Sequence, residues 1–456
     1  MKKIQSFSSE RSRQIVWGSV ALILSFSGGY FVAFAGVEGV VRLIQFIVLI
    51  GATLLILRRP YWGLVFIVAS LPLLDILPSI PFASSVVSLL GIVTLGAHLL
   101  SRTTHREKSF HWSASLVWGC LLVFWIIVSN PSASLLPGTD DRNWAFTFIQ
   151  LWLLAWLAAQ MLDTPSKHRT LIWVFSIAVL LSAVYALTQG NIGQSLKLSD
   201  RAEGLAGGAN SAARYFVVGL VFIVYLRATT KKSVVSFFLL LGLGLVIIAT
   251  FYTVSRTGLL LLFSAIGLSA IQRFAKYQIQ AVIGFVMAFL IIWLFADNIL
   301  TIIGTISSSI REGTDTVGLR YNLWRAGWRM WLDHPVHGVG IGQFVERLAS
   351  YGSDLLEPRR LRLGAHNMYV QVLAETGLVG FFLFLAMLIS TIREIWTLRN
   401  LSDPSIITLA QTWFIVFVIM LLGGLTKHDH YDKLIWIMVG IGIGLQDRKN
   451  GFDENR

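Results

Sequence analysis

Long apolar runs recur along the whole sequence, and they constrain the fold more than any other feature. Hydrophobic residues make up 55% of the 456-residue chain, and only 13% of its residues are charged. A soluble domain is about one-quarter charged, so this chain is too apolar to fold in water. Because many runs are long enough to cross a bilayer as helices, they predict a polytopic membrane protein. The short alternating segments of a transmembrane barrel do not occur in the sequence.

The predicted fold is therefore all-α, a polytopic transmembrane helical bundle of about twelve to fourteen spans. Sixteen tryptophans suit the aromatic belts of such a bundle at its two interfaces. The spans are expected at 15–35, 39–57, 61–78, 84–100, 114–129, 144–161, 170–188, 212–228, 234–252, 257–272, 278–296, 368–391, 405–424 and 433–446.

Loops rich in Lys and Arg alternate with loops poor in Lys, and this alternation predicts the orientation. Short basic loops stay in the cytoplasm, so both termini are expected there, the net charge of +13 is topological, and the first span is expected to be retained. The loop at 425–433 fits least well, because it carries Lys427 and Lys433 on the outward side. Three regions are predicted: a transmembrane bundle at 1–296, a long periplasmic loop at 297–367 bearing part of the active site, and transmembrane helices with a cytoplasmic tail at 368–456.

The long outward loop at 297–367 contains eight Arg, seven acidic residues and no Lys. Arginine without lysine favours fixed recognition of phosphate or carboxylate, although internal ion pairs of a solvated loop are the alternative. Trp324, Trp328 and Trp331 recur at helical spacing, which predicts an amphipathic helix over 320–332 with its Trp side toward lipid. The glycines of 338–342 predict a flexible turn that lets the backbone approach a ligand or a neighbouring helix.

His366 stands where this polar loop joins an apolar helix, so a water-soluble group could meet a lipid-borne one there. On a helix over 366–380, Gly377 and Gly380 would lie on the same face as His366 and form a smooth groove beneath it. Glu375 would lie on the opposite face. An unperturbed imidazole titrates near pH ~6.5, which suits a general base. The alternative is an interfacial histidine with a structural role.

Several arginines stand close to the outward ends of spans. Arg256 follows so short a turn that its guanidinium must lie at the membrane surface, and Arg201 precedes a glycine-rich run that ends at Asn210. Arg214 stands just inside the next span, where a charge is costly unless it is paired. With Arg320, these residues could form a cationic cradle for a diphosphate leaving group. Snorkelling toward lipid headgroups is the alternative.

The sequence predicts neither a metal nor a cofactor. His428, Asp429 and His430 resemble a ligand cluster, but side chains at i and i+2 diverge on a helix. His334 and His337 are outward and could line the site. The single cysteine, Cys120, excludes an internal disulfide and is expected to be a core residue.

Two motifs resemble those of the bacterial O-antigen ligases. His366-Asn367, nine residues and then Gly377-Leu378-Val379-Gly380 match the pattern His-[Asn/Ser/Gln]-x9-Gly-x-x-[Gly/Thr/Tyr]. The stretch from Gly318-Leu319-Arg320 to Gly342-Gln343-Phe344 looks like the rest of the ligase and polymerase module, as does the span start Ser255-Arg256. The resemblance covers about residues 240–385.

This resemblance implies a metal-independent, inverting glycosyltransferase of GT-C type at the periplasmic face of the inner membrane, active in lipopolysaccharide biosynthesis. Its donor would be O-antigen on undecaprenyl pyrophosphate, and its acceptor the lipid A–core oligosaccharide. His366 would take the acceptor proton, with Arg256 and Arg201 as further catalytic residues. The candidate substrate-binding residues are Arg320, Asn367, Arg214, Asn210, Gln343, Tyr369 and His337.

Three other functions remain open at this point. An O-antigen polymerase would use a second lipid-linked repeat as the acceptor. A protein O-oligosaccharyltransferase often carries extra outward domains, which are not visible in this sequence. A transporter of lipid-linked glycans should place charged or broken helices at the bilayer midplane, whereas the notable polar groups here gather at one face.

Overall fold

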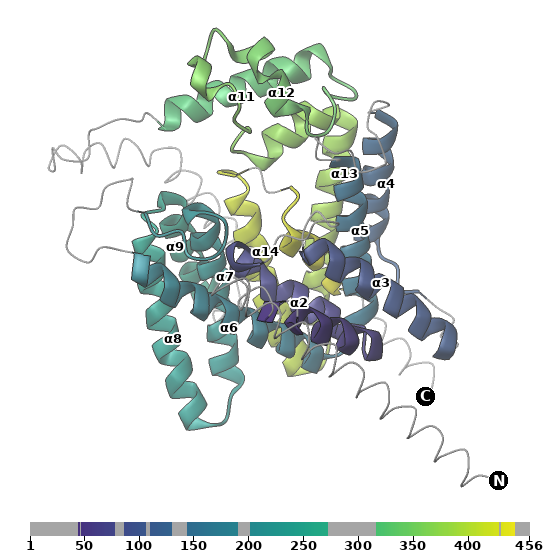
Figure 1. The fold of residues 1–456 in the computed structure, drawn as a ribbon, viewed down its shortest axis with the longest axis vertical. Coiled ribbons are helices and arrows are strands. Elements are labelled where there is room, and N and C mark those ends of the chain that lie inside the picture. Colours follow the sequence, from purple (N-terminus) through teal and green to yellow (C-terminus); the bar gives the residue numbers. More distant parts are fainter. Residues whose placement is uncertain are drawn as a thin grey trace, which may run out of the picture. The chain divides into compact units, whose positions relative to one another are not determined.

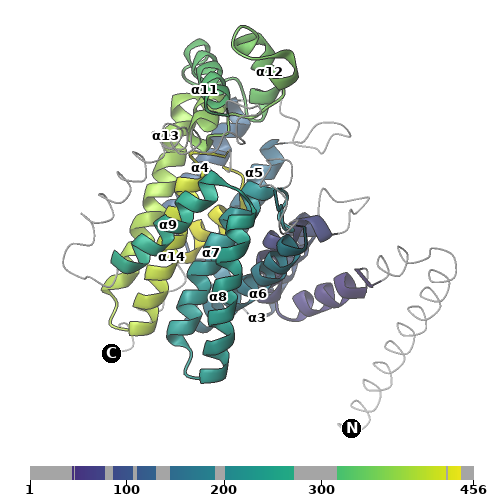
Figure 2. The same cartoon turned by 90° about the vertical axis from the view of Figure 1, so that its left-hand side faces the viewer.

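The computed structural model describes residues 44–45, 47–77, 86–105, 110–129, 144–189, 201–271, 316–427 and 430–442. Every regular element within these ranges is a helix, as Figure 1 and Figure 2 show. The predicted all-α class is confirmed.

Seven helices of the described residues are long and apolar enough to cross a membrane. They are α3 (Val86–His105), α5 (Trp144–Met161), α6 (Pro165–Gln189), α7 (Ala209–Thr229), α8 (Ser233–Tyr252), α13 (Met368–Thr397) and α14 (Pro404–Gly423). Shorter apolar helices are Ile47–Arg58, α2 (Tyr61–Ser70) with η1 (Leu71–Ile76), α4 (Ala114–Ser129), α9 (Arg256–Ile271) and Lys433–Gly442. Each predicted span that reaches the described residues coincides with one of these helices. The predicted spans 15–35 and 278–296 lie outside them.

Contacts divide the chain into two compact units, residues 1–63 with 77–101 and residues 64–76 with 102–456. In the first unit, Gly63 packs so closely on Thr94 of α3 that a Cβ atom would overlap the threonine side chain. Every candidate site residue belongs to the second unit. The domain boundaries expected at residues 296 and 367 remain a prediction.

Helix α7 forms the centre of the second unit. Its side chains are buried along nearly the whole length, because α6, α8, α9 and α14 all pack against it. Close approach needs a glycine at one point, since a Cβ at Gly219 would come within 2.6 Å of Val179 on α6. Helix α13 packs along α4 and also contacts α14, so that α14 touches both α7 and α13. This arrangement places the N-terminal parts of α7 and α13 against the C-terminal end of α14, where Gly423 lies against Arg214 and the amide of Met368 donates to the carbonyl of Gly424.

A small helical cap covers the beginning of α13. It contains α11 (Thr316–Asp333), α12 (Gln343–Gly352) and η3 (Pro358–Arg360), and Figure 1 shows α11 and α12 beside each other beyond α13. The helix predicted over 320–332 is confirmed as part of α11, whereas α12 was not predicted. Leu323, Met330 and Phe344 are fully buried in the core of this cap.

The tryptophans of α11 differ in their exposure, and contact of this face with lipid remains a prediction. Trp328 is 53% exposed, and Tyr321 and Leu332 continue the same exposed stripe at helical spacing. Trp324 instead packs against the cap core and donates a hydrogen bond from Nε1 to the carbonyl of Ala365 at 3.0 Å. One side of the tryptophan face is therefore part of the cap.

Helix α13 breaks at Gly377, which has φ 66° and ψ −169°. The break frees backbone groups, and other segments bind them: the amides of Val339 and Gly340 donate to the carbonyls of Ala374 and Glu375 at 2.9 and 3.0 Å. Satisfying such groups is what makes a broken helix tolerable in an apolar protein. The glycines of 338–342 therefore allow the close backbone approach to a helix that their composition suggested.

The smooth glycine groove below His366 was a wrong prediction. His366 precedes α13 rather than belonging to it, so it does not share a helical face with the glycines. A Cβ atom at Gly377 would overlap the backbone of Val336, and one at Gly380 would overlap Thr376. The space beside each glycine is thus occupied by other atoms of the protein, so no groove remains there.

Candidate active site

His366 is held in a strained backbone conformation just before the N-terminus of α13. Its φ is +48°, a left-handed value that non-glycine residues adopt at a cost and that clusters at functional sites. Its neighbours are fixed on both sides. Ala365 receives the Trp324 hydrogen bond, and its own amide donates to the Gln371 side chain at 3.2 Å. The amide of Met368 donates to the carbonyl of Gly424 at 2.7 Å.

Asn367 is the N-cap of α13. Its Oδ1 accepts hydrogen bonds from the amides of Tyr369 at 2.9 Å and Val370 at 3.2 Å, and the side chain is buried. Because N-cap geometry needs an extended backbone, Asn367 fixes the direction in which the chain enters the helix. It thereby fixes the backbone next to His366, and the contact of Asn367 with the substrate remains a prediction.

The pKa of His366 is lowered to about 4, first by burial and then by the positive charges of Arg320 and Lys427. The sequence had suggested an unperturbed imidazole. At neutral pH this imidazole is uncharged, so it has a lone pair with which to accept a proton. An anion that neutralised Arg320 and Lys427 would raise the pKa of His366 and make it a stronger base.

Arg201, Asn210 and Ser255 form a hydrogen-bonded cluster at the N-terminal ends of α7 and α9. The Oδ1 atom of Asn210 accepts from Arg201 NH2 at 2.8 Å and from the Ser255 hydroxyl at 2.9 Å. Arg201 also donates from Nε to the carbonyl of Thr253 at 3.0 Å. The guanidinium is therefore held in one place, which is what recognition of a phosphate requires.

Arg256 begins α9 beside this cluster. Its side chain is exposed. The pKa of Arg201 is lowered first by burial and then, to a smaller extent, by the positive charge of Arg256. The preceding Val254 has φ +48°, which is unusual for a β-branched residue. Like charges at the positive end of a helix favour an anion between them. The predicted closeness of Arg201 and Arg256 is thus observed.

Lys427 interacts with both His366 and the start of α7. Its Nζ donates to the Ser211 hydroxyl at 2.5 Å, next to Asn210 at the start of α7, and its charge also acts on His366. Burial is the main reason why the pKa of Lys427 is lowered to about 8. Sequence reasoning did not include this lysine among the site residues. The available signal was its position as a lysine in a loop otherwise assigned to the Lys-poor side.

Arg214 is buried in the second unit. Its side chain is only 4% exposed, and it forms an ion pair with Asp432 at 2.7 Å. The Tyr215 hydroxyl donates to the same carboxylate at 3.1 Å. The structure thus gives Arg214 a buried carboxylate partner, which offsets the cost of its charge, and contact of Arg214 with the substrate remains a prediction.

The other predicted substrate-binding residues separate into two groups. Arg320 acts on His366, and Tyr369 lies on the first turn of α13 with its hydroxyl donating to the Leu421 carbonyl at 3.1 Å. His337 and Gln343 do not join them. His337 lies against Gly377, about three turns along α13, and its Nδ1 is 2.7 Å from the carbonyl of Gly338.

Gln343 begins α12 in the segment that packs against the broken part of α13. There the buried carboxylate of Glu375 accepts hydrogen bonds from the Phe344 amide at 3.2 Å and from Gln371 Nε2 at 3.1 Å. The Oε2 atom of Glu375 lies 3.9 Å from Nε2 of His430, and both side chains are 1% exposed. Glu375 thus ties this segment to α13 and is not a partner of His366.

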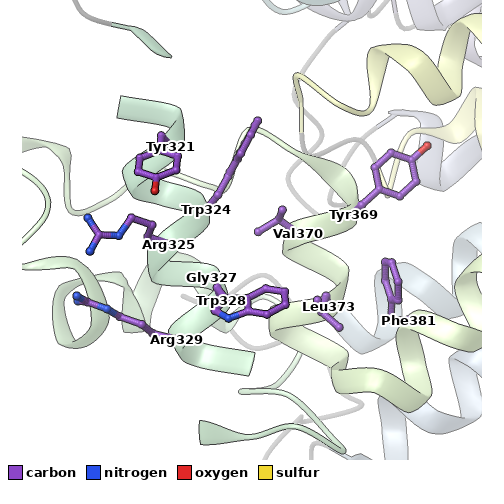
Figure 3. A pocket seen from close by; sticks show the side chains of 10 residues that line it. All are labelled: Tyr321, Trp324, Arg325, Gly327, Trp328, Arg329, Tyr369, Val370, Leu373 and Phe381. Atoms are coloured by element: carbon purple, nitrogen blue, oxygen red, sulfur yellow. The ribbon is translucent and has the colours of Figure 1, made fainter. Parts of the chain in front are cut away.

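A groove with a volume of about 550 Å³ opens between α11 and α13. Figure 3 shows Trp324 and Trp328 projecting from α11 toward α13, and Arg325 and Arg329 extending the other way. Its lining residues are Tyr321, Trp324, Arg325, Gly327, Trp328, Arg329, Tyr369, Val370, Leu373 and Phe381.

Residues 241–385 match a protein-family model described as O-antigen ligase. This segment makes up about one-third of the chain, and it is similar to the O-antigen ligase family. The match supports a function of the O-antigen ligase and polymerase type in general, and the seven candidate spans support a multi-pass membrane protein. A comparison with curated proteins found no match.

The matched segment contains Arg256, Arg320 and His366, whereas Arg201 and Lys427 come from outside it. The site therefore draws on residues before, within and after the matched segment. Among the described residues, no three His, Cys, Asp or Glu side chains gather as metal ligands would. His428 and Asp429 lie outside the described residues, and metal-independent catalysis remains a prediction.

Proposed function

We propose that this protein transfers O-antigen polysaccharide from undecaprenyl pyrophosphate to the lipid A–core oligosaccharide. The observation that carries the proposal is the connection of two sets of groups. The positive charges of Arg320 and Lys427 act on His366. Lys427 also donates a hydrogen bond to Ser211, which follows Asn210 in the sequence. Asn210 in turn accepts a hydrogen bond from Arg201. A proton acceptor and several cations thus adjoin one another, which is the equipment that displacement of a diphosphate by a hydroxyl group needs.

In the proposed reaction, the diphosphate of the donor lies against Arg201 and Arg256, with Lys427 and Arg320 toward His366. Binding of this anion offsets the positive field on the imidazole and raises its pKa. The base then becomes competent only when the donor is present. This coupling would limit proton abstraction from a hydroxyl group in an empty site.

The acceptor hydroxyl attacks the anomeric carbon of the donor sugar from the side opposite the diphosphate. One glycosidic C–O bond forms, the C–O bond to the diphosphate breaks, and the hydroxyl proton moves to His366. Undecaprenyl pyrophosphate leaves with the bonding electron pair, and the arginines stabilise its developing charge. A single displacement inverts the anomeric centre. We place the reaction at the periplasmic face of the inner membrane, because the basic loops were assigned to the cytoplasm.

The deciding experiment uses purified protein with lipid-linked O-antigen and lipid A–core, with and without a chelator. A conjugate of O-antigen with lipid A–core supports the ligase. A longer lipid-linked glycan identifies a polymerase, and transfer to an added protein acceptor identifies an oligosaccharyltransferase. Loss of transfer in the chelator, restored by a divalent cation, would contradict the metal-independent mechanism.

A further inference from the structure

Gln371 lies one turn into α13 and binds the segment that carries His366. Its Oε1 atom accepts a hydrogen bond from the amide of Ala365 at 3.2 Å, and its Nε2 atom donates to Oε1 of Glu375 at 3.1 Å. The residues Gln371 and Glu375 are only 5% and 1% exposed. A buried amide that loses its acceptor costs free energy, so the side chain of Gln371 holds Ala365 in place.

The direction of these hydrogen bonds is fixed by the backbone. The amide of Ala365 can only donate, so it requires the oxygen of Gln371 and leaves the NH2 group to face Glu375. That NH2 group in turn needs an acceptor, which the carboxylate of Glu375 supplies. An apolar side chain of similar size at either position would fill the space but interrupt the hydrogen bonds.

Glu375 is itself held by segments outside α13. The amide of Phe344, in the first turn of α12, donates to the same Oε1 atom at 3.2 Å. Nε2 of His430 lies 3.9 Å from the other carboxylate oxygen. A continuous set of hydrogen bonds therefore runs from α12 through Glu375 and Gln371 to Ala365, and the position of Ala365 depends on the contact of α12 with α13.

Ala365 matters because His366, the next residue, has the strained φ of +48°. Such a conformation persists only where the surrounding contacts enforce it. The carbonyl of Ala365 accepts from Trp324 Nε1 at 3.0 Å, and its amide donates to Gln371. Both peptide groups of Ala365 are thus fixed, one by the cap and the other by α13.

We propose that Gln371 is a positioning residue for the His366 base, and that Glu375 holds the Gln371 amide in the orientation that Ala365 needs. The inference rests on the proposed function, in which His366 accepts the proton of the acceptor. Gln371 acts only through the backbone before His366, so it affects the chemical step and not the binding of the donor. The base is in place only while α12 contacts α13.

The first test is Gln371→Met, which keeps the length of the side chain and removes both hydrogen bonds. We expect kcat to fall about tenfold or more, because a misplaced base loses its geometry, while KM for the lipid-linked donor stays constant. Hydrogen exchange of the amides in 363–367, followed by mass spectrometry, should become about tenfold faster. Gln371→Asn is too short to reach Ala365 and should behave in the same way, which provides a second variant if methionine prevents folding.

Thr391→Val is the matched control on the same helix. It also removes a buried hydrogen bond, from the Thr391 hydroxyl to the carbonyl of Met387 at 2.9 Å, and Thr391 is 1% exposed. We expect kcat and the exchange of residues 363–367 to remain unchanged in this variant. Equal effects in Gln371→Met and Thr391→Val would overturn the proposal, because general destabilisation of α13 would then explain both.

A double-mutant cycle tests the role of Glu375. Glu375→Gln keeps an oxygen for Gln371 and should retain most of kcat, whereas Glu375→Leu should lower kcat at least as much as Gln371→Met. Because both residues act through one contact, Gln371→Met should add little further loss in the Glu375→Leu protein. Losses that simply multiply would overturn the connection between Glu375 and Gln371.

Three further results would overturn the positioning role. A rise in KM for the donor would make Gln371 a binding residue. A lower kcat without faster exchange at 363–367 would mean that Gln371 contacts the reactants directly, and faster exchange with full kcat would separate this segment from catalysis.

A failure of the proposed function is a distinct outcome, seen when the unsubstituted protein transfers no glycan to any acceptor. Hydrogen exchange then still tests the structural claim. Faster exchange at 363–367 in Gln371→Met, but not in Thr391→Val, supports Gln371 as the residue that holds the backbone at His366. Unchanged exchange overturns it.

Discussion

The N-terminal ends of α9 and α13 have similar backbone structures but opposite electrostatic environments. Each follows a non-glycine residue with φ +48°, Val254 before α9 and His366 before α13. Each is also capped by a side chain. Ser255 Oγ accepts from the Gly258 amide at 3.1 Å, and Asn367 Oδ1 accepts from the Tyr369 amide at 2.9 Å. Backbone strain at both positions is maintained by these caps and by the packing around them.

The two helix ends differ in their charge: one carries exposed positive charge, and the other holds a neutral imidazole. At α9, Arg256 is exposed and adds its charge to that of Arg201, which Asn210 holds in place. At α13, burial and two nearby cations keep His366 neutral. One helix start therefore attracts an anion, and the other preserves a proton acceptor. The negative charge of a diphosphate bound between them would act on both helix ends, so substitutions at either end should change activity.

The largest effect should follow from removing the imidazole. We expect His366→Ala to reduce transfer by about 10²–10⁴, the usual contribution of a positioned base, while donor binding persists. Transfer would be measured with purified protein, and donor binding by competition with undecaprenyl pyrophosphate. His334→Ala is the control, because His334 lies near His337 at the far end of the cap's contact with α13. Transfer that survives in His366→Ala would remove this histidine from the chemistry.

A smaller loss is expected at the other helix start. Arg256→Ala should lower kcat/KM for the diphosphate donor about a hundredfold or more, because a fixed cation facing the leaving group is lost. The thermal unfolding temperature in detergent should barely change, since the side chain is exposed. Arg347→Ala, an exposed arginine on α12, controls for the general loss of positive charge. If folded yield fell as steeply as activity, Arg256 would be structural.

The apolar helices and α11 could be predicted from the sequence, but α12, Lys427 and the contacts between distant segments could not. Apolar runs mark the spans, and the spacing of the tryptophans marks α11. The break in α13 escapes such reasoning, because Gly377 is tolerated only when a segment some forty residues earlier supplies Val339 and Gly340 as donors. Likewise, Arg214 resembles Arg256 as an arginine at a span start, and only Asp432, far along the chain, identifies it as a buried ion pair.

The dependence of kcat/KM on pH should reflect the titration of both His366 and Lys427. His366 accepts a proton only when it is deprotonated, so kcat/KM should fall as pH drops through about 4. Lys427 attracts the donor only while it is protonated, so kcat/KM should also fall, by about tenfold, as pH rises through about 8. Lys427→Arg keeps its charge at high pH and should abolish the alkaline decline. Lys427→Met removes a positive charge near His366 and should shift the acid limb to higher pH. Profiles that are identical in all three proteins would separate Lys427 from the site.

The smallest effect should come from the cap that orients His366. Asn367→Ala removes the acceptor for two amides at the start of α13 and should lower the free energy of unfolding by ~1 kcal/mol. The same change lets the imidazole leave its strained position, so kcat should fall severalfold while KM for the donor stays constant. Asn367→Ser is the matched variant, because serine caps nearly as well as asparagine. If Asn367→Ser restores both stability and kcat, the residue acts through the backbone at His366. If it restores stability alone, the asparagine amide itself contacts the acceptor, as the sequence first suggested.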